Sequence, residues 1–350
     1  MPNFAIISDQ HWGVNGDNPF FLDNYVKFYD NIFFPGLVEH KVKAVLIPGD
    51  FWQSRKNINP LTLSIACKEF FAKLEAMGMP VFIAYGNHDV YYKNTNTVNT
   101  IDFLGEMFDN VTVVPTHLSF DNITLMSWIC PDNQVELYDV IEKAPTKYLV
   151  GHFEIEGHEM TPGYPCQHGL SKGMFANWEK VVSGHFHVRG DDGLVFYTSN
   201  PSQTNWADYG AAKGFHILND ETGELTPIDN PYEVYAVHDY DEYVSPAAVI
   251  GDPLLENLRD KIVKIVVTSY VDVNLDLLKK FIVAVTEIAH KVVVVETEKF
   301  TAKTELEVGE DIKVMSIRDV LVDFAKETAT GDNKDDVAAA MGAPYDKATS

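Results

Sequence analysis

The first two-thirds of the chain repeats one pattern of hydrophobic and polar positions. A short apolar run ends abruptly in a polar cluster, and this happens five times, with the runs at residues 4–7, 44–47, 81–85, 148–150 and 181–183. Apolar runs of this length, bounded by Gly and other turn residues, are typical of buried strands. The pattern therefore predicts five buried strands, each of which ends in polar side chains.

Two longer segments between the first three runs, residues 21–40 and 60–77, have apolar residues at helical spacing. Strand, helix, strand units with right-handed crossovers align their strands in parallel, and ligands of such sheets bind at the carboxyl ends. We therefore expect the polar clusters to converge. Around residues 111–130, two strand-like stretches flank Asp121-Asn122, a turn signal that predicts a hairpin.

After about residue 230 the pattern changes. The segment 261–296 contains a β-branched run, a helical stretch with Leu and Ile on one face, and a second β run, which together predict a compact strand, helix, strand unit. It carries no candidate ligand cluster, so we assign it to a separate small domain. Ser316–Glu327 follows as an amphipathic helix, and the polar, Ala-rich end is expected to be loose.

Four parts are therefore expected along the chain. They are a large α/β domain, a small α+β domain, a linker with a helix, and a flexible tail, at residues 1–230, 231–300, 301–328 and 329–350. The length of 350 residues exceeds the usual size of one domain, which agrees with this division.

Composition narrows the class of protein. Hydrophobic residues make up 46% and charged residues 22%, as in ordinary globular proteins. No apolar run approaches the ~20 residues of a membrane span, and the N-terminus lacks the features of a secretory signal. We expect a cytoplasmic protein without membrane association, in the host cytoplasm if the chain is phage-encoded. Cys67, Cys130 and Cys166 are widely spaced and odd in number, so they suggest neither a disulfide framework nor a thiolate zinc site.

The formal net charge of −24 argues against a generally basic nucleic-acid binder, because neutralising phosphates needs clustered Lys and Arg. A nucleic-acid substrate stays compatible with this charge under two conditions. Metal ions can offset the local carboxylates, or a basic partner can supply much of the binding surface.

The polar clusters contain a set of hard and imidazole metal ligands: Asp9, His11, Asp50, Asn87, His152, His185 and His187. Hydrolysis of a phosphate ester needs charge neutralisation, hydroxide at neutral pH and a stabilised in-line transition state, and two metals about 3.5–4 Å apart can supply all three. Imidazole and oxygen ligands without thiolate favour manganese, iron or zinc over calcium.

Taken one at a time, these residues have plain structural explanations. A lone His is more often structural than a ligand, and a lone Asp or Asn at a strand end is as often a turn former. His185 and His187 differ, since alternate positions after a strand place both on one side. The set as a whole predicts the metal site. The remaining histidines receive no role: His40, His117, His158, His168, His216, His238 and His290.

Five motifs, D-x-H, G-D, G-N-H-D, G-H and G-H-x-H, occur in this order, each after a predicted strand. Singly they are weak signals, but together they resemble the calcineurin-like metallophosphoesterase superfamily. The resemblance implies a layered α/β sandwich, with two β-sheets flanked by helices. It also implies that the first metal is held by Asp9, His11 and His187, the second by Asn87, His152 and His185, with Asp50 bridging. His88 would stabilise the transition state or protonate the leaving oxygen, and Asp89 would orient His88.

Within this superfamily the chain resembles the SbcD-type nucleases of DNA double-strand-break repair complexes, especially the recombination endonuclease subunits of tailed phages. The resemblance covers about residues 3–300 and is carried by Asp9–Gly13, Gly86–Asp89, Tyr91–Asn94, Gly151–Glu154 and Ser183–His187. It implies a 3′-to-5′ exonuclease on duplex DNA that is also a single-strand endonuclease, with manganese as the favoured metal and magnesium as the alternative.

The same resemblance implies partners. The active form would be a homodimer, with residues 60–75 and 95–108 as the proposed contact, joined to an SMC-like coiled-coil ATPase of the SbcC type. Residues 231–300 would be a DNA-capping domain, and Ser316–Glu327 would dock on the coiled coil of the ATPase.

Two features leave alternatives open. Phe51-Trp52-Gln53 stands where the family often has an acidic residue, which affects the surroundings of Asp50 more than metal binding itself. The Gly- and Pro-rich loop Gly157–Gly173 contacts DNA, a second protomer or only solvent. A protein phosphatase or cyclic-nucleotide phosphodiesterase is disfavoured, because Gln53-Ser54-Arg55 does not match the Asp-Arg-Gly of phosphatases and a small-molecule enzyme has little use for the added domain. A non-catalytic scaffold is disfavoured because all seven ligands and His88 are present.

Overall fold

The computed structural model describes residues 2–240, 253–268 and 274–296. It divides into two compact units, Met1–Val234 and Tyr235–Ser350. The predicted docking helix Ser316–Glu327, its linker and the tail lie outside the described residues. Within the described part, no helix combines the length and apolar character needed to cross a membrane.

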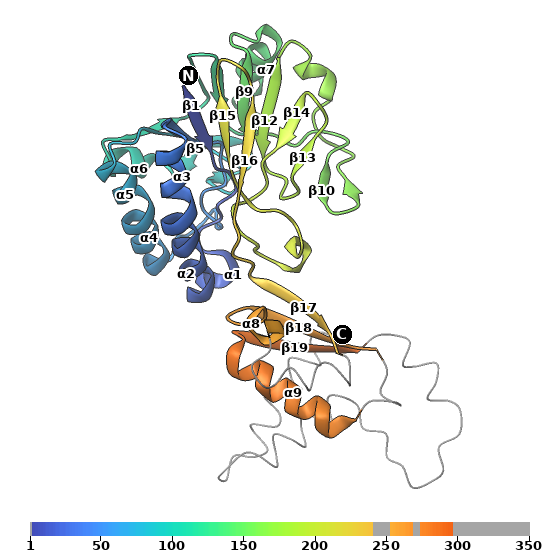
Figure 1. Ribbon diagram of the computed structural model, residues 1–350. Helices are drawn as coiled ribbons and strands as arrows, with labels where there is room; N and C mark the ends of the chain where they lie inside the picture. The colour runs from blue at the N-terminus through green and yellow to red at the C-terminus, as the bar shows by residue number, and fades with distance from the viewer. Residues whose placement is uncertain (1, 241–252, 269–273, 297–350) are drawn as a thin grey trace. The chain divides into compact units, whose positions relative to one another are not determined.

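The first unit contains two six-stranded sheets, and the first has the strand order β16-β15-β1-β2-β3-β6 (Figure 1). Its four parallel strands are β1 (Asn3–Ile6), β2 (Val42–Ile47), β3 (Val81–Ala84) and β6 (Val111–Val114), and β15 (Gly214–Asn219) and β16 (Leu225–Asp229) are antiparallel. The first three predicted strands are thus confirmed as β1, β2 and β3. Their shared direction brings the polar clusters that follow them to one edge.

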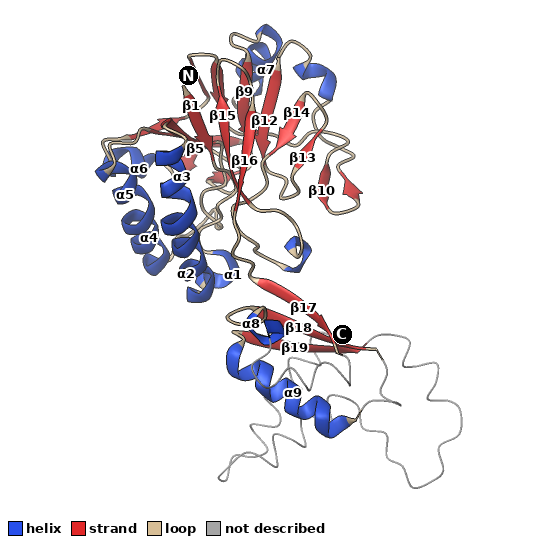
Figure 2. Ribbon diagram, in the orientation of Figure 1, coloured by secondary structure: helices blue, strands red, loops and turns tan. Residues whose placement is uncertain are grey.

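Helices cover the outer face of this sheet (Figure 2). They are α1 (Val14–Asp17), α2 (Pro19–Phe28), η1 (Tyr29–Phe33), α3 (Phe34–Glu39), α4 (Pro60–Ala66), η2 (Cys67–Phe71), α5 (Ala72–Ala76) and α6 (Asp102–Met107). The two predicted helices are confirmed, but each contains a wide π turn, η1 or η2. The first π turn ends at Phe33, two residues before Pro35, which has no N–H for the carbonyl four residues earlier.

The second sheet has the order β13-β14-β12-β9-β8-β7. Its parallel strands are β8 (Ile123–Met126), β9 (Tyr148–His152), β12 (Lys180–Gly184) and β14 (Val195–Tyr197), and the antiparallel edges are β7 (His117–Phe120) and β13 (Gly190–Asp191). The hairpin predicted around Asp121-Asn122 is confirmed as β7 and β8. The run 111–114, which the sequence grouped with it, belongs instead to the first sheet, where β6 pairs with β3.

The two sheets pack face to face through one apolar layer. Phe4, Ile6 and Leu46 from the first sheet contact Leu125 and Val150 from the second within a single buried cluster. The outer face of the second sheet packs on α7 (Gln134–Lys143) and the 3-10 helix η3 (Lys172–Phe175). The predicted two-sheet sandwich is therefore confirmed.

Smaller elements surround this sandwich. They are the hairpins β4 (Val90–Tyr92) with β5 (Thr95–Asn99) and β10 (Glu159–Thr161) with β11 (Tyr164–Pro165), and the 3-10 helix η4 (Trp206–Asp208). The segment Gly157–Gly173 is thus more than a loop, because it contains the β10–β11 hairpin and the buried Cys166.

The second unit is a three-stranded parallel sheet, in the order β17-β18-β19, with helices α8 and α9. Its elements are β17 (Tyr235–Asp239), α8 (Pro253–Glu256), β18 (Ile262–Val267), α9 (Leu275–Ile288) and β19 (Lys291–Glu296). The side chain of Asn274 caps α9, which buries Leu278, Phe281 and Val285 in the apolar cluster of this unit. The predicted strand, helix, strand unit is confirmed, and β17 adds a strand that the sequence did not reveal.

Candidate metal centre

The loops after β1 and β2 hold their polar residues in a left-handed backbone conformation. Asp9, His11 and Asp50 have φ angles of 51°, 47° and 51°. Backbone hydrogen bonds tie the loops together, from Asp9 N to the Gly49 carbonyl at 3.2 Å and from His11 N to the Asp50 carbonyl at 3.0 Å. A left-handed backbone costs of order 1–3 kcal/mol per non-glycine residue. Three such residues in these two loops indicate that the direction of their side chains matters more than the strain of their backbone.

Glycines in the motifs allow these loops to approach one another closely. A Cβ on Gly86 would collide with the backbone nitrogen of Asp50, and a Cβ on Gly184 would collide with the hydroxyl of Ser8. The first contact joins the loops after β2 and β3. The second joins the two sheets, because Gly184 ends β12 and Ser8 follows β1. The glycines of these motifs therefore set the spacing between the ligand-bearing loops.

Three side chains form a first cluster of potential ligand atoms. Nε2 of His11 lies 3.1 Å from Nε2 of His187, which is 4.0 Å from Oδ1 of Asp9. The carboxylate of Asp9 also accepts the backbone N–H of His185, at 2.9 Å and 3.1 Å to its two oxygens. Strand ends from both sheets thus supply one cluster.

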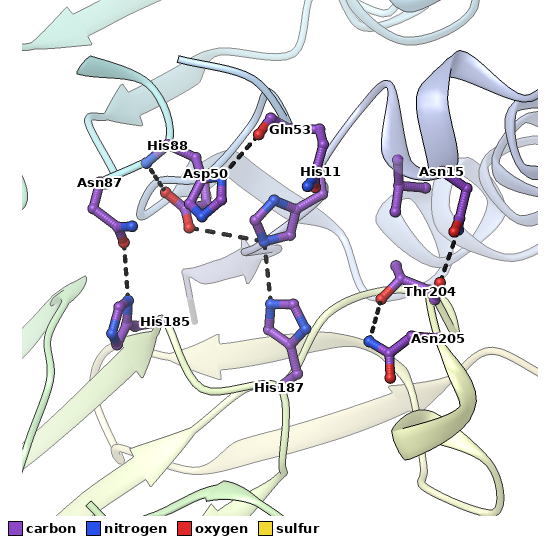
Figure 3. Close-up of a pocket in the computed structure, with 11 residues that line it drawn as sticks. His11, Asn15, Asp50, Gln53, Asn87, His88, His185, His187, Thr204 and Asn205 are labelled. Atoms are coloured by element: carbon purple, nitrogen blue, oxygen red, sulfur yellow. Dashed lines mark hydrogen bonds and ion pairs between the residues drawn. The ribbon is translucent and has the colours of Figure 1, made fainter. Parts of the chain in front are cut away.

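A second cluster lies beside the first. Oδ1 of Asn87 is 2.9 Å from Nε2 of His152 and 2.9 Å from Nδ1 of His185, and these two nitrogens are 3.2 Å apart. Asp50 stands between the clusters, because its Oδ2 is 3.8 Å from Nε2 of His11 (Figure 3) and 3.3 Å from Nε2 of His152. All seven sequence-predicted ligand residues therefore converge at one place.

The donor set fits two divalent cations. The facing atoms of the two clusters are imidazole nitrogens, an amide oxygen and carboxylate oxygens, which suit manganese, iron or zinc. Asp9, His11, Asp50 and His152 are nearly fully buried, and such a concentration of buried acceptor atoms is costly without a cation. In the described part of the chain, His/Asp groups of metal-binding spacing include Asp9 with His11 and His187, and Asp50 with His152 and His185.

Burial and neighbouring charges move the proton affinities of these groups apart. Burial lowers the pKa of His185 to about 3 and holds the pKa of His11 well below its usual range. Burial also opposes the charged form of His152, but Asp50 outweighs this effect and raises the pKa of His152 to about 9. Burial alone would raise the pKa of Asp50, but the neighbouring His152 keeps the pKa of Asp50 well below its usual range. His11 and His185 are therefore neutral at pH 7, which leaves their lone pairs free for a cation.

His88 lies at the rim of the centre and is held by the second motif. Its Nδ1 is 2.8 Å from the backbone carbonyl of Gln53, and its own N–H donates to Oδ1 of Asp50 at 2.7 Å. Since a carbonyl only accepts, Nδ1 carries the proton of a neutral ring and leaves Nε2 as the acceptor. The His88 ring stands edge-on to His11, with centroids 4.9 Å apart. This geometry fixes the direction of the imidazole.

The expectation that Asp89 orients the His88 ring needs correction. The Asp89 carboxylate is fully buried and accepts three backbone N–H groups, from Gly86 at 2.9 Å, Trp52 at 3.1 Å and Phe51 at 3.3 Å. Burial, together with the nearby Asp50 charge, raises the pKa of Asp89 to about 7. Asp89 acts on the backbone of the two motif loops, and the orientation of the ring comes from Gln53.

Other residues of the site had no sequence signal. A cavity of about 340 Å³ exposes both clusters, and its lining also includes Asn15, Gln53, Thr204 and Asn205. Behind it, the buried ammonium of Lys213 donates to the carbonyl of His187 at 2.8 Å and pairs with Asp208 at 2.6 Å. A lone Lys before a strand gives no hint of this role, because one of its partners is the backbone carbonyl of His187, 26 positions away.

Comparison with known proteins places these motifs in context. The family profile described as calcineurin-like phosphoesterase matches residues 2–189. The chain is 26% identical over 334 residues to exonuclease subunit 1 of Enterobacteria phage T4, covering 91% of this chain and 90% of that protein.

Solved structures are similar at lower identity. An archaeal phosphodiesterase is 15% identical with a TM-score of 0.32, over 65% of this chain and 99% of its own. A dimetal phosphatase from Danio rerio is 12% identical with a TM-score of 0.35, over 62% of this chain and 91% of its own. A nuclease from Pseudomonas putida is 16% identical with a TM-score of 0.31, over 64% of this chain and 86% of its own.

Proposed function

Since this chain belongs to the calcineurin-like phosphoesterase family, we propose that it is a two-metal DNA nuclease. The observation that carries the proposal is the convergence of seven ligand residues, five of which line one cavity together with His88. DNA as the substrate is supported by the similarity to a phage exonuclease subunit, which extends over 91% of the chain and so includes most of the second unit.

In this proposal the first cation is held by Asp9, His11 and His187, the second by Asn87, His152 and His185, and Asp50 is shared. When bound, two cations at these residues would supply charge neutralisation for the phosphate and a water molecule of lowered pKa for hydrolysis at neutral pH. We take manganese as the metal in use, because the mixed nitrogen and oxygen donors suit manganese. Magnesium is the alternative.

The chain's own residues provide positioning and proton transfer. Gln53 and Asp50 hold His88 at the cavity, where Nε2 of its imidazole contacts the phosphate or, when the ring is protonated, donates a proton to the leaving oxygen. Asp89 keeps the two loops that carry Asp50 and His88 at a fixed spacing. The burial of Asp9 and Asp50 excludes bulk water from one side of the centre.

Finer features follow from the resemblance to SbcD-type nucleases. They are 3′-to-5′ digestion of duplex ends, endonuclease cleavage of single strands, a homodimer, a capping role for residues 231–300, and action in DNA repair or recombination in the cytoplasm. The high net negative charge of −24 makes a partner with its own DNA-binding surface part of this proposal.

The proposed partner is an SMC-like coiled-coil ATPase that binds Ser316–Glu327. A pull-down of such an ATPase with the full chain, and with a chain that ends at Lys313, tests this. Loss of binding with retained manganese-dependent cleavage is expected for the shorter chain. Retained binding contradicts the assignment.

The main experiment uses end-labelled linear duplex DNA, with and without manganese. Metal-dependent shortening is expected, and His88→Ala is expected to slow it by about 10²–10⁴-fold, as general acid–base groups do. His168→Ala is the matched control, because His168 is exposed and lines neither this cavity nor the one beside it. Intact DNA together with hydrolysis of bis-p-nitrophenyl phosphate would leave a phosphoesterase whose substrate is not DNA.

A further inference from the structure

A second cavity, of about 300 Å³, opens beside the metal centre. It shares His185, His187 and Asn205 with the first cavity, so the two adjoin. Its remaining walls come from the tip of the β10–β11 hairpin, the segment after β12, and η4. Figure 1 shows β10 beyond the β13 edge of the second sheet. A substrate held at the metal centre therefore has this second cavity as its immediate neighbour.

The linings of the two cavities differ in chemistry. The first is lined by carboxylate, imidazole and amide groups. The second is lined by a thioether, a proline ring and aromatic and aliphatic groups, from Met160, Pro162, Phe186, Val188 and Ala207. Such a surface suits a flat, weakly polar ring, whereas a phosphate would find no cation there.

The polar groups of the second cavity are already engaged within the protein. The carboxylate of Asp208 pairs with Lys213 at 2.6 Å and accepts the backbone N–H of Thr204 at 2.8 Å. The amide of Asn205 accepts the N–H of Ala207 at 2.8 Å. Apart from His185 and His187, which belong to the metal centre, few polar groups are left to bind an ion, so the apolar walls determine which ligand the cavity accepts.

The hairpin that forms one wall is anchored at its base and exposed at its tip. Cys166 is buried and its N–H donates to the carbonyl of His158 at 2.8 Å, while the Cys166 carbonyl accepts from Gly157 at 2.9 Å. Met160, in the middle of β10, is 42% exposed. Because a methionine side chain is flexible, an anchored hairpin that presents one to a cavity can contact ligands of varied shape.

We propose that the second cavity receives the nucleobase next to the phosphodiester that is cleaved. This inference rests on the proposed function and names the form of its substrate. A base that is stacked and paired in a duplex cannot enter a cavity of this size, so the base must leave the stack. Unstacking costs a few kcal/mol in a duplex and least in a single strand or a mismatch. The cavity therefore selects single-stranded or frayed DNA at the point of cleavage.

The test compares three dinucleotides with the same phosphodiester in the presence of manganese. They are dithymidine monophosphate and its two analogues in which one or the other thymine is replaced by an abasic site. Removal of one particular thymine is expected to lower kcat/KM by about tenfold, mainly through KM, since the contacts of one base with an apolar or aromatic wall contribute to binding. Removal of the other thymine is expected to matter less.

Two variants assign this preference to the cavity. Ala207→Phe fills it from an exposed position and is expected to lower cleavage of dithymidine monophosphate to the level of the sensitive abasic analogue, whose own cleavage stays unchanged. Met160→Ala removes one wall and is expected to reduce the preference severalfold. Met107→Ala is the matched control, because Met107 is 56% exposed on α6 and lines neither cavity.

The outcomes separate this inference from the function beneath it. Cleavage that is indifferent to both thymines overturns the inference alone, as does an Ala207→Phe variant that slows all three dinucleotides equally. If neither the dinucleotides nor longer DNA are cut while bis-p-nitrophenyl phosphate is split, the proposed nuclease function fails and the inference fails with it.

Discussion

The two units of the chain differ in where they place polar groups and left-handed backbone. In Met1–Val234, strand ends hold buried carboxylates and imidazoles, and Asp9, His11 and Asp50 have φ angles near 50°. In the described part of Tyr235–Ser350, an apolar cluster fills the space between α9 and its sheet, and Asp260 is the one non-glycine residue there with positive φ. The first unit therefore contains locally unfavourable features, namely buried charges and left-handed backbone, that are rare in the described part of the second.

This difference indicates that ligand binding constrains the first unit and core packing constrains the second. Departures from ordinary packing rules gather where a ligand must be bound, whereas a region that obeys them has its stability set by its core. The first unit is therefore expected to lose activity upon small polar changes, with little loss of fold. The second unit is expected to lose stability upon core truncation, with little effect on the chemistry of phosphodiester hydrolysis.

The largest effect is expected for Asp50→Asn. This change keeps the shape of the side chain, and the amide oxygen still accepts the N–H of His88, but the charge between the two ligand clusters is lost. Since two-metal charge stabilisation supplies several kcal/mol, hydrolysis of bis-p-nitrophenyl phosphate should fall by about 10³-fold. Steady-state kinetics measures this, and titration calorimetry measures the accompanying loss of manganese affinity.

The control for this change is Asp23→Asn, at an exposed carboxylate on α2. It should leave both the rate and the metal affinity as they are. A decrease of less than tenfold for Asp50→Asn would show that the buried polar groups of the first unit are structural, and the comparison between the units would lose its functional meaning.

The next effect concerns the core of the second unit. Phe281 is fully buried on α9, with its ring centroid 4.9 Å from that of His238 and 5.6 Å from that of Tyr240. Phe281→Ala should destabilise this unit by about 3–5 kcal/mol, through lost contacts and the cavity left behind. Hydrolysis of bis-p-nitrophenyl phosphate should stay within about twofold of the wild-type rate, because the metal-centre cavity is lined by residues of the first unit.

Differential scanning calorimetry and the same kinetic assay, run on one preparation, check this. Leu275→Ala is the matched control on the same helix, since Leu275 is 37% exposed. A parallel loss of hydrolysis and stability in Phe281→Ala would mean that the units act as one cooperative body, so that hydrolysis depends on the core of both.

The smallest effect is a pH dependence of the metal-free first unit. Asp50 raises the pKa of buried His152 to about 9, against an ordinary value of 6.5. A raised pKa stabilises the fold fully below about pH 6.5, and this contribution is lost as pH rises through 9. With a chelator present, the melting temperature should therefore fall between pH 6.5 and 9, by roughly 2–4 °C per kcal/mol. His152→Gln should remove this slope, and a melting temperature that rises over the same range in the wild type would refute it.

Sequence reasoning succeeded where the information is local. Each apolar run is short, buried and followed by a polar cluster, so its strand could be predicted, and parallel strands necessarily bring their ends together. Asp9 therefore meets His187, and Asn87 meets His185, although each pair is far apart along the chain. The start of α9 is local information of the same kind, because the side chain of Asn274 caps its first turn.

It failed where the information is non-local or belongs to the backbone. Any residue at position 53 offers a carbonyl, so nothing in the sequence marks Gln53 as the partner of His88. The pairing of Lys213 with Asp208 and the His187 carbonyl depends on the folded path of the chain. The resemblance implied that Asp89 orients the His88 ring, whereas the Asp89 carboxylate accepts the backbone N–H groups of Phe51 and Trp52.

The metal centre joins the two ends of a long stretch of chain, because His11 and His187 lie 176 positions apart. During translation at about 5–20 residues per second, roughly 9–35 s pass between the synthesis of these two histidines. β1 must also wait for β15, with which Asn3 to Ile6 pair in register. A nascent or prematurely terminated chain thus carries only fragments of the centre. Synthesis itself delays the appearance of a hydrolase that acts on phosphodiesters until both sheets have closed.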